Sequence, residues 1–285
     1  MSEVIADTTA HPPPFTPEKI AFIGAGNMTS AIIRGMVKAG YPTSMLMATN
    51  RSPEKLDVLA NELGIQTSTD NAAALDFADT IVLAVKPQML AEMCAALPDS
   101  KQDKSYISIA AGVSVARIQE MLDAPVQVVR TMPNTPSAIG MGMTGLYAQN
   151  NTVTALRVCA EYCLKQVGQT LWVTHEDDIN TVIAAAGSSP AYVFLFAEAM
   201  QAKTQELGLA EQDAKLLVAQ ALAGAGQMLL ENPDIDFATL RANVTSKGGT
   251  TAQAIASFKQ ANLTNIIADA MQTAVDRARE MQANI

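Results

Sequence analysis

Two short stretches of the sequence place glycines and small polar residues where a helix is about to begin. In "FIGAGNMTSAI", Gly24 and Gly26 follow an apolar run and precede a helical pattern. In "NVTSKGGTTAQAI" (243–255), a pair of adjacent glycines and then a pair of adjacent threonines lead into another apolar helix, and the stretch has no acid or histidine. A helix start offers free N–H groups and the positive end of the helix dipole. Both stretches are therefore suited to binding an anion such as a phosphate or carboxylate.

The first stretch has the order strand, turn, helix that dinucleotide-binding sites use. Gly24 would permit the tight turn, and Gly26 would let a pyrophosphate approach the backbone at the helix start. The third small position of this fingerprint holds Thr29, which is bulkier than the glycine or alanine that close packing favours. A glycine pair alone is a weak signal, so the neighbouring strand ends decide the interpretation.

The end of the second expected strand favours a phosphorylated cofactor. Sites for NAD carry an acid there for the ribose 2′-hydroxyl, whereas this chain has Asn50, Arg51 and Ser52. An acid would repel a 2′-phosphate, and an arginine beside a helix start attracts one. We therefore expect NADPH as the cofactor, with NADH as a weaker substitute. The competing interpretation is a surface arginine beside an ordinary helix cap.

"LAVKPQ" (83–88) ends another strand at the same expected edge of the sheet, where ligands of open α/β sheets bind. Lys86 has the chemistry for an acid–base role. The alternative is that Pro87 fixes the turn while Lys86 is solvated or runs along the cofactor. "ISIAAGV" and "RTMPNTP" reach the same edge, and their small or kinked residues allow backbone contact with a cofactor.

The elements that must position these residues divide the 285-residue chain in two. Short apolar runs alternate with helical patterns up to "QTLWV", which predicts an α/β fold with a Rossmann-type, doubly wound parallel sheet over residues 18–174. Residues 175–285 are alanine-rich and predict an all-helical domain. Residues 1–17 predict a flexible extension, because acids and prolines stand where a signal peptide needs positive charge and an apolar helix.

Composition excludes several classes of function. The net charge of −9 disfavours nucleic acid as a partner, because that binding depends on Lys and Arg. The apolar stretches are too short or interrupted for a membrane span, so no membrane partner is expected. Cys94, Cys159 and Cys163 have neither disulfide nor zinc spacing. We therefore expect no metal site and a cytoplasmic location, with the cysteines serving in packing.

Three segments together, "IGAGNM", "AVKPQ" with "RTMPNTP", and "NVTSKGGTTAQAI", resemble the pyrroline-5-carboxylate reductase family from about Lys19 onward. The Gly-Gly-x-Thr segment is the specific part of this resemblance. The resemblance implies a helical C-terminal domain that dimerises by interleaving helices. It also implies NAD(P)H-dependent reduction of 1-pyrroline-5-carboxylate to L-proline, the last step of proline biosynthesis.

The resemblance also implies site residues. The implied cofactor contacts are Gly24, Ala25, Gly26, Asn27, Met28, Asn50, Arg51, Ser52, Asn71, Val85, Lys86, Pro87, Ile109, Ala110 and Ala111. The implied substrate contacts are Glu176, Asn243, Gly249, Thr250 and Thr251. Glu176, beside Asp177 and Asp178, has the alternative of simply placing charge near a helix start. The chain departs from the family pattern at Thr29 and at Ser189, where the family has a glycine.

The chemistry of this substrate suits the second stretch, residues 243–255. A glycine-rich turn entering a helix offers converging N–H donors to the one carboxylate of a small cyclic imine. A protonated imine is already electrophilic, so hydride transfer needs positioning more than a strong acid. Thr251, through its hydroxyl, is the candidate partner of the ring nitrogen. The alternative for the loop is a helix start without a ligand.

Two other functions share this plan. A β-hydroxyacid dehydrogenase-like oxidoreductase needs an acid or base for alcohol and carbonyl chemistry, yet no Lys, Arg or His occurs from Ala184 through Met200. A non-catalytic NADP-sensing protein has no need of a carboxylate site. The apolar character of residues 175–285 exceeds what that region could bury alone, which predicts at least a homodimer acting on a small-molecule substrate.

Overall fold

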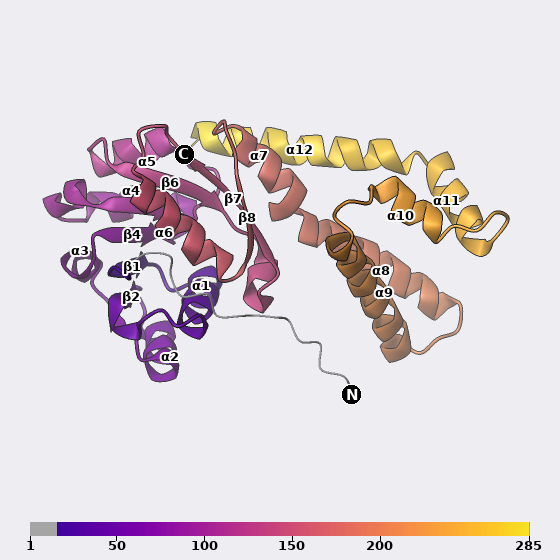
Figure 1. Ribbon diagram of the computed structural model, residues 1–285, viewed down its shortest axis with the longest axis horizontal. Helices are drawn as coiled ribbons and strands as arrows, with labels where there is room; N and C mark the ends of the chain where they lie inside the picture. Colours follow the sequence, from indigo (N-terminus) through magenta and orange to yellow (C-terminus); the bar gives the residue numbers. More distant parts are fainter. Residues whose placement is uncertain (1–15, 285) are drawn as a thin grey trace. The chain divides into compact units, whose positions relative to one another are not determined.

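The computed structural model describes residues 16–284, so most of the extension predicted at 1–17 lies outside the described residues. Contacts divide the chain into two compact units (Figure 1). One unit runs through Gly187 and includes the C-terminal segment from Ala274, and the other is Ser188–Thr273. This division follows contacts within the fold and is a different quantity from the domain limits expected from the sequence, 18–174 and 175–285, which remain predictions.

The first unit is built on a sheet of eight strands in the order β3-β2-β1-β4-β5-β6-β7-β8. All neighbouring strands pair in parallel except β6 and β7, which are antiparallel. The strands are β1 (Ile20–Ile23), β2 (Leu46–Thr49), β3 (Gln66–Ser68), β4 (Thr80–Leu83), β5 (Ser105–Ser108), β6 (Gln127–Met132), β7 (Gly142–Ala148) and β8 (Gly168–Trp172). The predicted Rossmann-type α/β fold is therefore confirmed.

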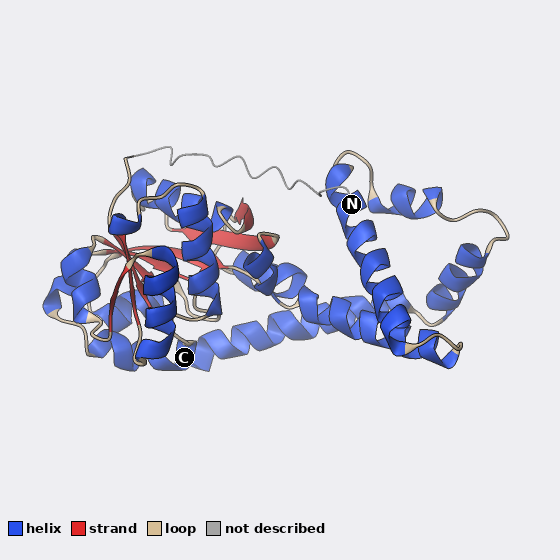
Figure 2. Cartoon of the chain, turned by 90° about the horizontal axis from the view of Figure 1, so that it is seen from below, coloured by secondary structure: helices blue, strands red, loops and turns tan. Residues whose placement is uncertain are grey.

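Helices cover both faces of this sheet (Figure 2). Alternate residues of each strand face opposite sides, so Ile20 and Phe22 pack with one set of helices and Ala21 and Ile23 with the other. The first set is α1 (Asn27–Lys38), α2 (Pro53–Leu63) and α6 (Thr154–Lys165). The second set is α3 (Ala72–Phe77), α4 (Pro87–Ala95) and α5 (Val115–Leu122).

The structure differs from the sequence-based prediction in three details. β3 was not predicted, because its three residues are polar and lie at the edge of the sheet. β7 reverses direction after the short helical turn η3 (Thr135–Ile139), so the sheet is not wholly parallel. Ser52 occupies the cap position of α2 without its hydroxyl capping the helix; the hydroxyl instead accepts a bond from Asn50 Nδ2 at 3.2 Å.

The remaining short elements of the first unit connect its main layers. They are the 3₁₀ turns η1 (Thr43–Met45) and η2 (Asp99–Asp103), helix α7 (Asp178–Val182) and the π-helical turn η4 (Ile183–Gly187). Helix α12 (Leu263–Asn284) ends in this unit, because its residues from Ala274 onward group with the sheet.

The second unit is helical throughout, as the sequence predicts. It contains α8 (Ser189–Glu206), α9 (Glu211–Glu231), α10 (Phe237–Asn243), α11 (Thr250–Gln260) and the first part of α12. α8 has no buried residue, and apolar side chains such as Phe194 and Leu195 are about two-thirds exposed. The helical stretch Asp178–Glu206 is long and apolar enough to cross a membrane by length and composition alone, and only 17% of its most apolar window is buried.

Candidate active site

The predicted cofactor residues lie at one edge of the first unit's sheet. Gly24–Met28 lie between β1 and α1, and 50–52 lie between β2 and α2. Val85–Pro87 lie between β4 and α4, and Ile109–Ala111 directly follow β5. Asn71 stands just before α3. Because β1, β2, β4 and β5 are parallel neighbours, their carboxyl ends meet at this edge, where open α/β sheets bind ligands.

The glycine turn has the geometry that a pyrophosphate requires. Gly24 has φ +111°, and a Cβ there would lie 2.6 Å from the carbonyl oxygen of Ala84, so only glycine fits. A Cβ on Gly26 would meet nothing within 4 Å, which leaves open room in front of α1. No side chain caps α1, so its first N–H groups are available to a phosphate. The residues present therefore fit a dinucleotide.

Thr29 points away from that open room. Its side chain is 1% exposed, and its hydroxyl has no hydrogen-bond partner among the described residues. Burying an unpaired hydroxyl costs roughly 1–3 kcal/mol. Thr29, where the family pattern has a smaller residue, therefore lowers the stability of the packing around α1. It does not fill the glycine turn.

Side-chain amides organise the edge beside β2. Asn50 Nδ2 donates to the Ser52 carbonyl oxygen at 3.0 Å, and Asn50 Oδ1 lies 3.5 Å from the Ala25 nitrogen. Thr49 Oγ1 donates to Asn71 Oδ1 at 2.7 Å. These contacts tie the glycine turn, the loop after β2 and the start of α3 together.

Two cations stand at this edge. Arg51 Nη2 lies 3.2 Å from Glu92 Oε1, and the two side chains are 65% and 76% exposed. Such an exposed pair is weak and leaves the guanidinium free to turn toward a phosphate. Lys86 is exposed and makes no ion pair or side-chain hydrogen bond with any residue that the structure describes, while Pro87 begins α4. This exposure fits the solvated alternative for Lys86 and gives an acid–base role no supporting contact.

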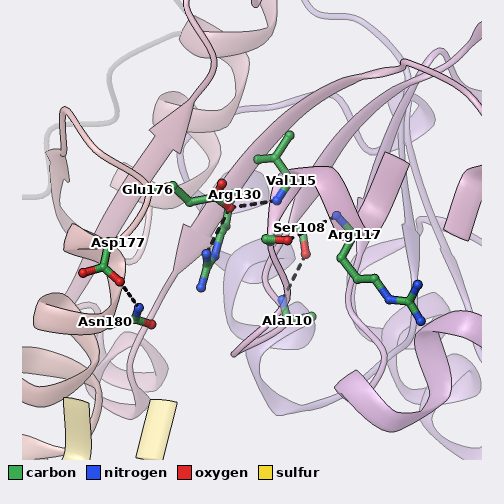
Figure 3. Close-up of polar contacts among 9 residues, drawn as sticks. Ser108, Ala110, Val115, Arg117, Arg130, Glu176, Asp177 and Asn180 are labelled. Atoms are coloured by element: carbon green, nitrogen blue, oxygen red, sulfur yellow. Dashed lines mark hydrogen bonds and ion pairs between the residues drawn. The ribbon is translucent and has the colours of Figure 1, made fainter. Parts of the chain in front are cut away.

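Glu176 lies in the first unit, where one of its carboxylate oxygens has two partners (Figure 3). Its Oε1 accepts a hydrogen bond from the Val115 nitrogen at 2.7 Å and lies 3.0 Å from Arg130 Nη1. Arg130 is 1% exposed, in the middle of β6, whereas the Glu176 side chain is 24% exposed. Sequence analysis did not single out Arg130, although an arginine inside the apolar run "QVVRTMP" was a signal that a buried partner had to exist.

Asn134 is a second residue that sequence analysis missed. It is 7% exposed, and its Nδ2 donates to the Ala186 carbonyl oxygen at 3.0 Å while its Oδ1 accepts from the Met143 nitrogen at 2.9 Å. It thereby joins the end of β6 to β7 and to the π-helical turn η4. The amide between two prolines in "MPNTP" was the available signal.

The second anion-binding stretch lies in the second unit, between α10 and α11. Asn243 ends α10, Gly248 has φ +75°, and Gly249 occupies the cap position of α11. The Gly249 nitrogen donates to the Ser246 carbonyl oxygen at 3.1 Å. A Cβ on Gly249 would lie 2.5 Å from Ser246 Oγ and 3.3 Å from the Ser246 carbonyl oxygen, so a side chain at this position would require Ser246 to rotate away.

The start of α11 is open to a ligand. No side chain caps the helix, and Thr250 and Thr251 are exposed. Their N–H groups belong to the first turn, which has no partners within a helix. The structure therefore places Gly249, Thr250 and Thr251 together at one set of free donors, whereas Asn243 ends the preceding helix and Glu176 belongs to the other unit.

Other polar features of the first unit are separate from these residues. A hollow of about 510 Å³ at the end of β7 is lined by Tyr147, Gln149, Asn150, Asn151, Thr174 and His175 and contains none of the predicted site residues. Within residues 16–284, no group of His, Cys, Asp or Glu is arranged to hold a metal ion. All three cysteines are buried and unpaired, and burial raises the pKa of the Cys94 thiol to about 11, as expected for a packing role.

Comparison with known proteins decides the family. The family model described as pyrroline-5-carboxylate reductase dimerisation matches residues 176–281, and the model described as NADP oxidoreductase, coenzyme F420-dependent, matches 19–112. A pyrroline-5-carboxylate reductase of Vibrio alginolyticus is 48% identical over 93% of this chain and 98% of its own length. The chain belongs to the pyrroline-5-carboxylate reductase family.

Solved structures agree with this membership. The pyrroline-5-carboxylate reductase of Coxiella burnetii has a TM-score of 0.87 and 38% identity, covering 93% of this chain and 99% of that one. The Plasmodium falciparum reductase, solved with NADP bound, has a TM-score of 0.81 and 25% identity, covering 93% and 98%. A reductive aminase from Aspergillus terreus, at 18% identity and a TM-score of 0.56, shares the fold. Membership in this family confirms the predicted oxidoreductase and identifies it as a pyrroline-5-carboxylate reductase rather than a β-hydroxyacid dehydrogenase-like enzyme or an NADP sensor.

Proposed function

We propose that this protein reduces 1-pyrroline-5-carboxylate to L-proline with NADPH, which is the last step of proline biosynthesis. The observation that carries the proposal is the uncapped start of α11 behind Gly248 and Gly249, inside the region that matches the family's dimerisation model. A sensor of the cofactor has no need of this carboxylate site. The substrate is inferred from the name of the relatives. The free N–H groups at the start of α11 are the groups that would hold it.

The residues of the chain bind and orient the substrate. The N–H groups of Thr250 and Thr251 would hold its carboxylate at the positive end of α11. The hydroxyl oxygen of Thr251 would accept a hydrogen bond from the N–H of the protonated ring nitrogen, which orients the C=N bond and favours its protonated form. When bound, the reduced nicotinamide supplies the hydride. Positioning of this kind is worth several kcal/mol of barrier without any strong acid.

The preference for NADPH rests on Arg51. Asn50, Arg51 and Ser52 stand at the end of β2, and no acid takes the place at which NAD sites bind the ribose 2′-hydroxyl. A 2′-phosphate would replace Glu92 as the partner of Arg51 and gain a stronger, doubly charged acceptor. NADH lacks that phosphate and would bind more weakly.

The apolar surface of the second unit supports a homo-oligomer, at least a dimer. Exposed apolar residues cluster on α8 and α9, including Val193, Phe194, Leu195, Phe196, Leu216, Leu217, Leu229 and Leu230. Many exposed apolar side chains on two neighbouring helices are typical of an interface between subunits. The membrane-like hydropathy of α8 has the same cause. A cytoplasmic location is part of the proposal and is supported by three unpaired, buried thiols.

A turnover assay with purified protein tests this function. The assay follows NADPH absorbance with and without 1-pyrroline-5-carboxylate, and the product is identified by chromatography against proline. Imine-dependent oxidation of NADPH with proline as product is the expected result. Binding of NADPH without turnover would favour the sensor and refute the enzyme.

A further inference from the structure

One carboxylate oxygen joins three separate segments of the first unit. Glu176 Oε1 accepts from the Val115 nitrogen at the start of α5 and pairs with Arg130 Nη1 in the middle of β6 (Figure 3). Glu176 itself precedes α7, through which the chain leaves the first unit. The three residues are 46 and 61 positions apart in the sequence, so this contact is a tertiary one.

Val115 is the end of the loop that is expected to face the cofactor. The loop begins at Ser108, whose hydroxyl accepts from the Ala110 nitrogen at 3.3 Å and whose carbonyl oxygen accepts from Thr131 Oγ1 at 3.0 Å. It turns at Gly112, with φ +73°, and enters α5 at Val115. The loop is therefore held by β5 and β6 at one end and by Glu176 at the other.

The carboxylate of Glu176 is set by the buried arginine. Arg130 is 1% exposed, its Nη2 has no partner among the described residues, and its Nη1 pairs with Glu176. A buried guanidinium needs a carboxylate, so Arg130 holds Glu176 in place beside the Val115 amide. Ser114 caps α5 separately, because its hydroxyl accepts from the Arg117 nitrogen at 3.2 Å.

From these contacts we propose that Glu176 and Arg130 are positioning residues for the cofactor loop, residues 109–114. The proposal rests on the function proposed above. Glu176 acts by fixing the end of the loop that carries Ile109, Ala110 and Ala111, and Arg130 acts by orienting Glu176. The role expected for Glu176 from the family resemblance, contact with the substrate, would have a different signature in kinetics.

The test compares Glu176→Ala with wild type in two measurements that do not require turnover. Hydrogen–deuterium exchange reads the protection of the peptide that covers 109–117, and a titration reads the Kd for NADPH. We expect exchange in that peptide to rise about tenfold and the Kd to rise about fivefold or more, because the Val115 amide and the loop both lose their anchor. Glu120→Gln, which removes an exposed carboxylate from the same helix, should change neither.

Two further variants keep the test decisive if Glu176→Ala fails to fold. Glu176→Gln keeps an oxygen for the Val115 amide and loses the charge, so we expect a smaller rise in exchange. Arg130→Lys keeps the charge and loses the guanidinium geometry, and we expect the same kind of change in the peptide 109–117. Unchanged exchange and unchanged Kd in these variants would overturn the proposal.

Comparing the KM for 1-pyrroline-5-carboxylate with the Kd for NADPH separates a positioning role of Glu176 from direct contact with the substrate. A rise confined to the KM for 1-pyrroline-5-carboxylate, with the NADPH Kd and the exchange unaltered, would overturn positioning and support contact. If wild-type protein shows no imine-dependent turnover, the proposed function fails, while the exchange and Kd measurements still test the anchoring of the loop.

Discussion

Arg279 Nη2 lies 2.6 Å from Asp177 Oδ2, which joins the end of α12 to the residue that directly follows Glu176. The two residues are 102 positions apart. Asp177 also accepts a bond from Asn180 Nδ2 at 2.9 Å. Two adjacent carboxylates therefore hold the ends of this connection. Glu176 binds β6 where the chain leaves the first unit, and Asp177 binds α12 where the chain returns to it.

This ion pair predicts a specific dependence of stability on pH. Hydrogen bonding from Arg279 is the largest cause that holds the pKa of Asp177 below its usual value, followed by the bond from Asn180. A lowered pKa in the folded state means that the stabilisation is present above the unfolded pKa of about 3.9 and is lost as pH falls through the folded value. Arg279→Gln should therefore lower the Tm slightly at pH 6, and this effect should shrink as the pH falls below the unfolded value.

Thermal melts of wild type and Arg279→Gln from pH 7 down to the acid limit of folding check this prediction. Arg277→Gln, which removes an exposed pair with Glu280 on the same helix, is the matched control. A Tm difference for Arg279→Gln that stayed constant across this range would show that Asp177 is not the partner that matters.

Gly24 and Gly26 should respond differently to alanine. Gly24→Ala introduces a Cβ 2.6 Å from the Ala84 carbonyl oxygen at φ +111°, and we expect a loss of roughly 1–3 kcal/mol in the free energy of unfolding. Gly26→Ala meets no protein atom within 4 Å, so stability should change little while NADPH binding weakens strongly. Urea unfolding and NADPH titration separate the two effects. Normal NADPH affinity in Gly26→Ala would place the pyrophosphate elsewhere.

Arg51→Gln tests the cofactor preference. We expect the KM for NADPH to rise roughly tenfold to a hundredfold, since a hydrogen bond to a charged group contributes about 1.5–3 kcal/mol. The KM for NADH should stay near its wild-type value, because NADH has no 2′-phosphate. Lys55→Gln, which removes another exposed cation from α2, should leave both values unchanged. An equal loss with both cofactors would argue against a contact with the 2′-phosphate.

Thr251→Val tests the partner assigned to the ring nitrogen. Valine keeps the volume and removes the hydroxyl, so we expect kcat to fall roughly tenfold to a hundredfold with little change in NADPH affinity. Thr273→Val removes an exposed hydroxyl from α12 in the same unit and serves as the control. Steady-state kinetics identical to wild type would leave Thr251 without a role in the reaction.

Leu195→Glu tests the apolar surface of α8. Leu195 is 67% exposed, and a charge placed within an obligate interface should shift the protein toward monomer in light scattering at micromolar concentration. Val58→Glu alters a side chain that is 53% exposed on α2 in the first unit and should leave the mass unchanged. A monomeric wild-type protein would refute the proposed homo-oligomer outright.

Local sequence patterns were sufficient to predict the strands other than β3 and the open edge that carries the glycine turn. Runs such as Ile20–Ile23 are buried on both faces, and the turn residues Gly24 and Gly26 have strict backbone requirements that remain visible in one sequence. The direction of β7 was not predictable in this way, because it depends on how η3 folds back after Asn134. The substrate itself came from family resemblance and not from any periodicity.

The pairing of Arg130 with Glu176 is a clearer example of a contact that could not be predicted from the sequence. Each residue has an ordinary local explanation, and only the fold brings a β6 arginine, an α5 amide and a carboxylate before α7 to one point. An arginine within an apolar run indicates that a buried acidic partner exists. The sequence does not indicate which of the 28 acidic residues is that partner.

A crystal structure with proline and oxidised cofactor would test the central claim most directly. We expect the proline carboxylate within hydrogen-bond distance of the Thr250 and Thr251 nitrogens at the start of α11, with the ring nitrogen near the Thr251 hydroxyl. A carboxylate bound away from residues 248–251 would contradict the account.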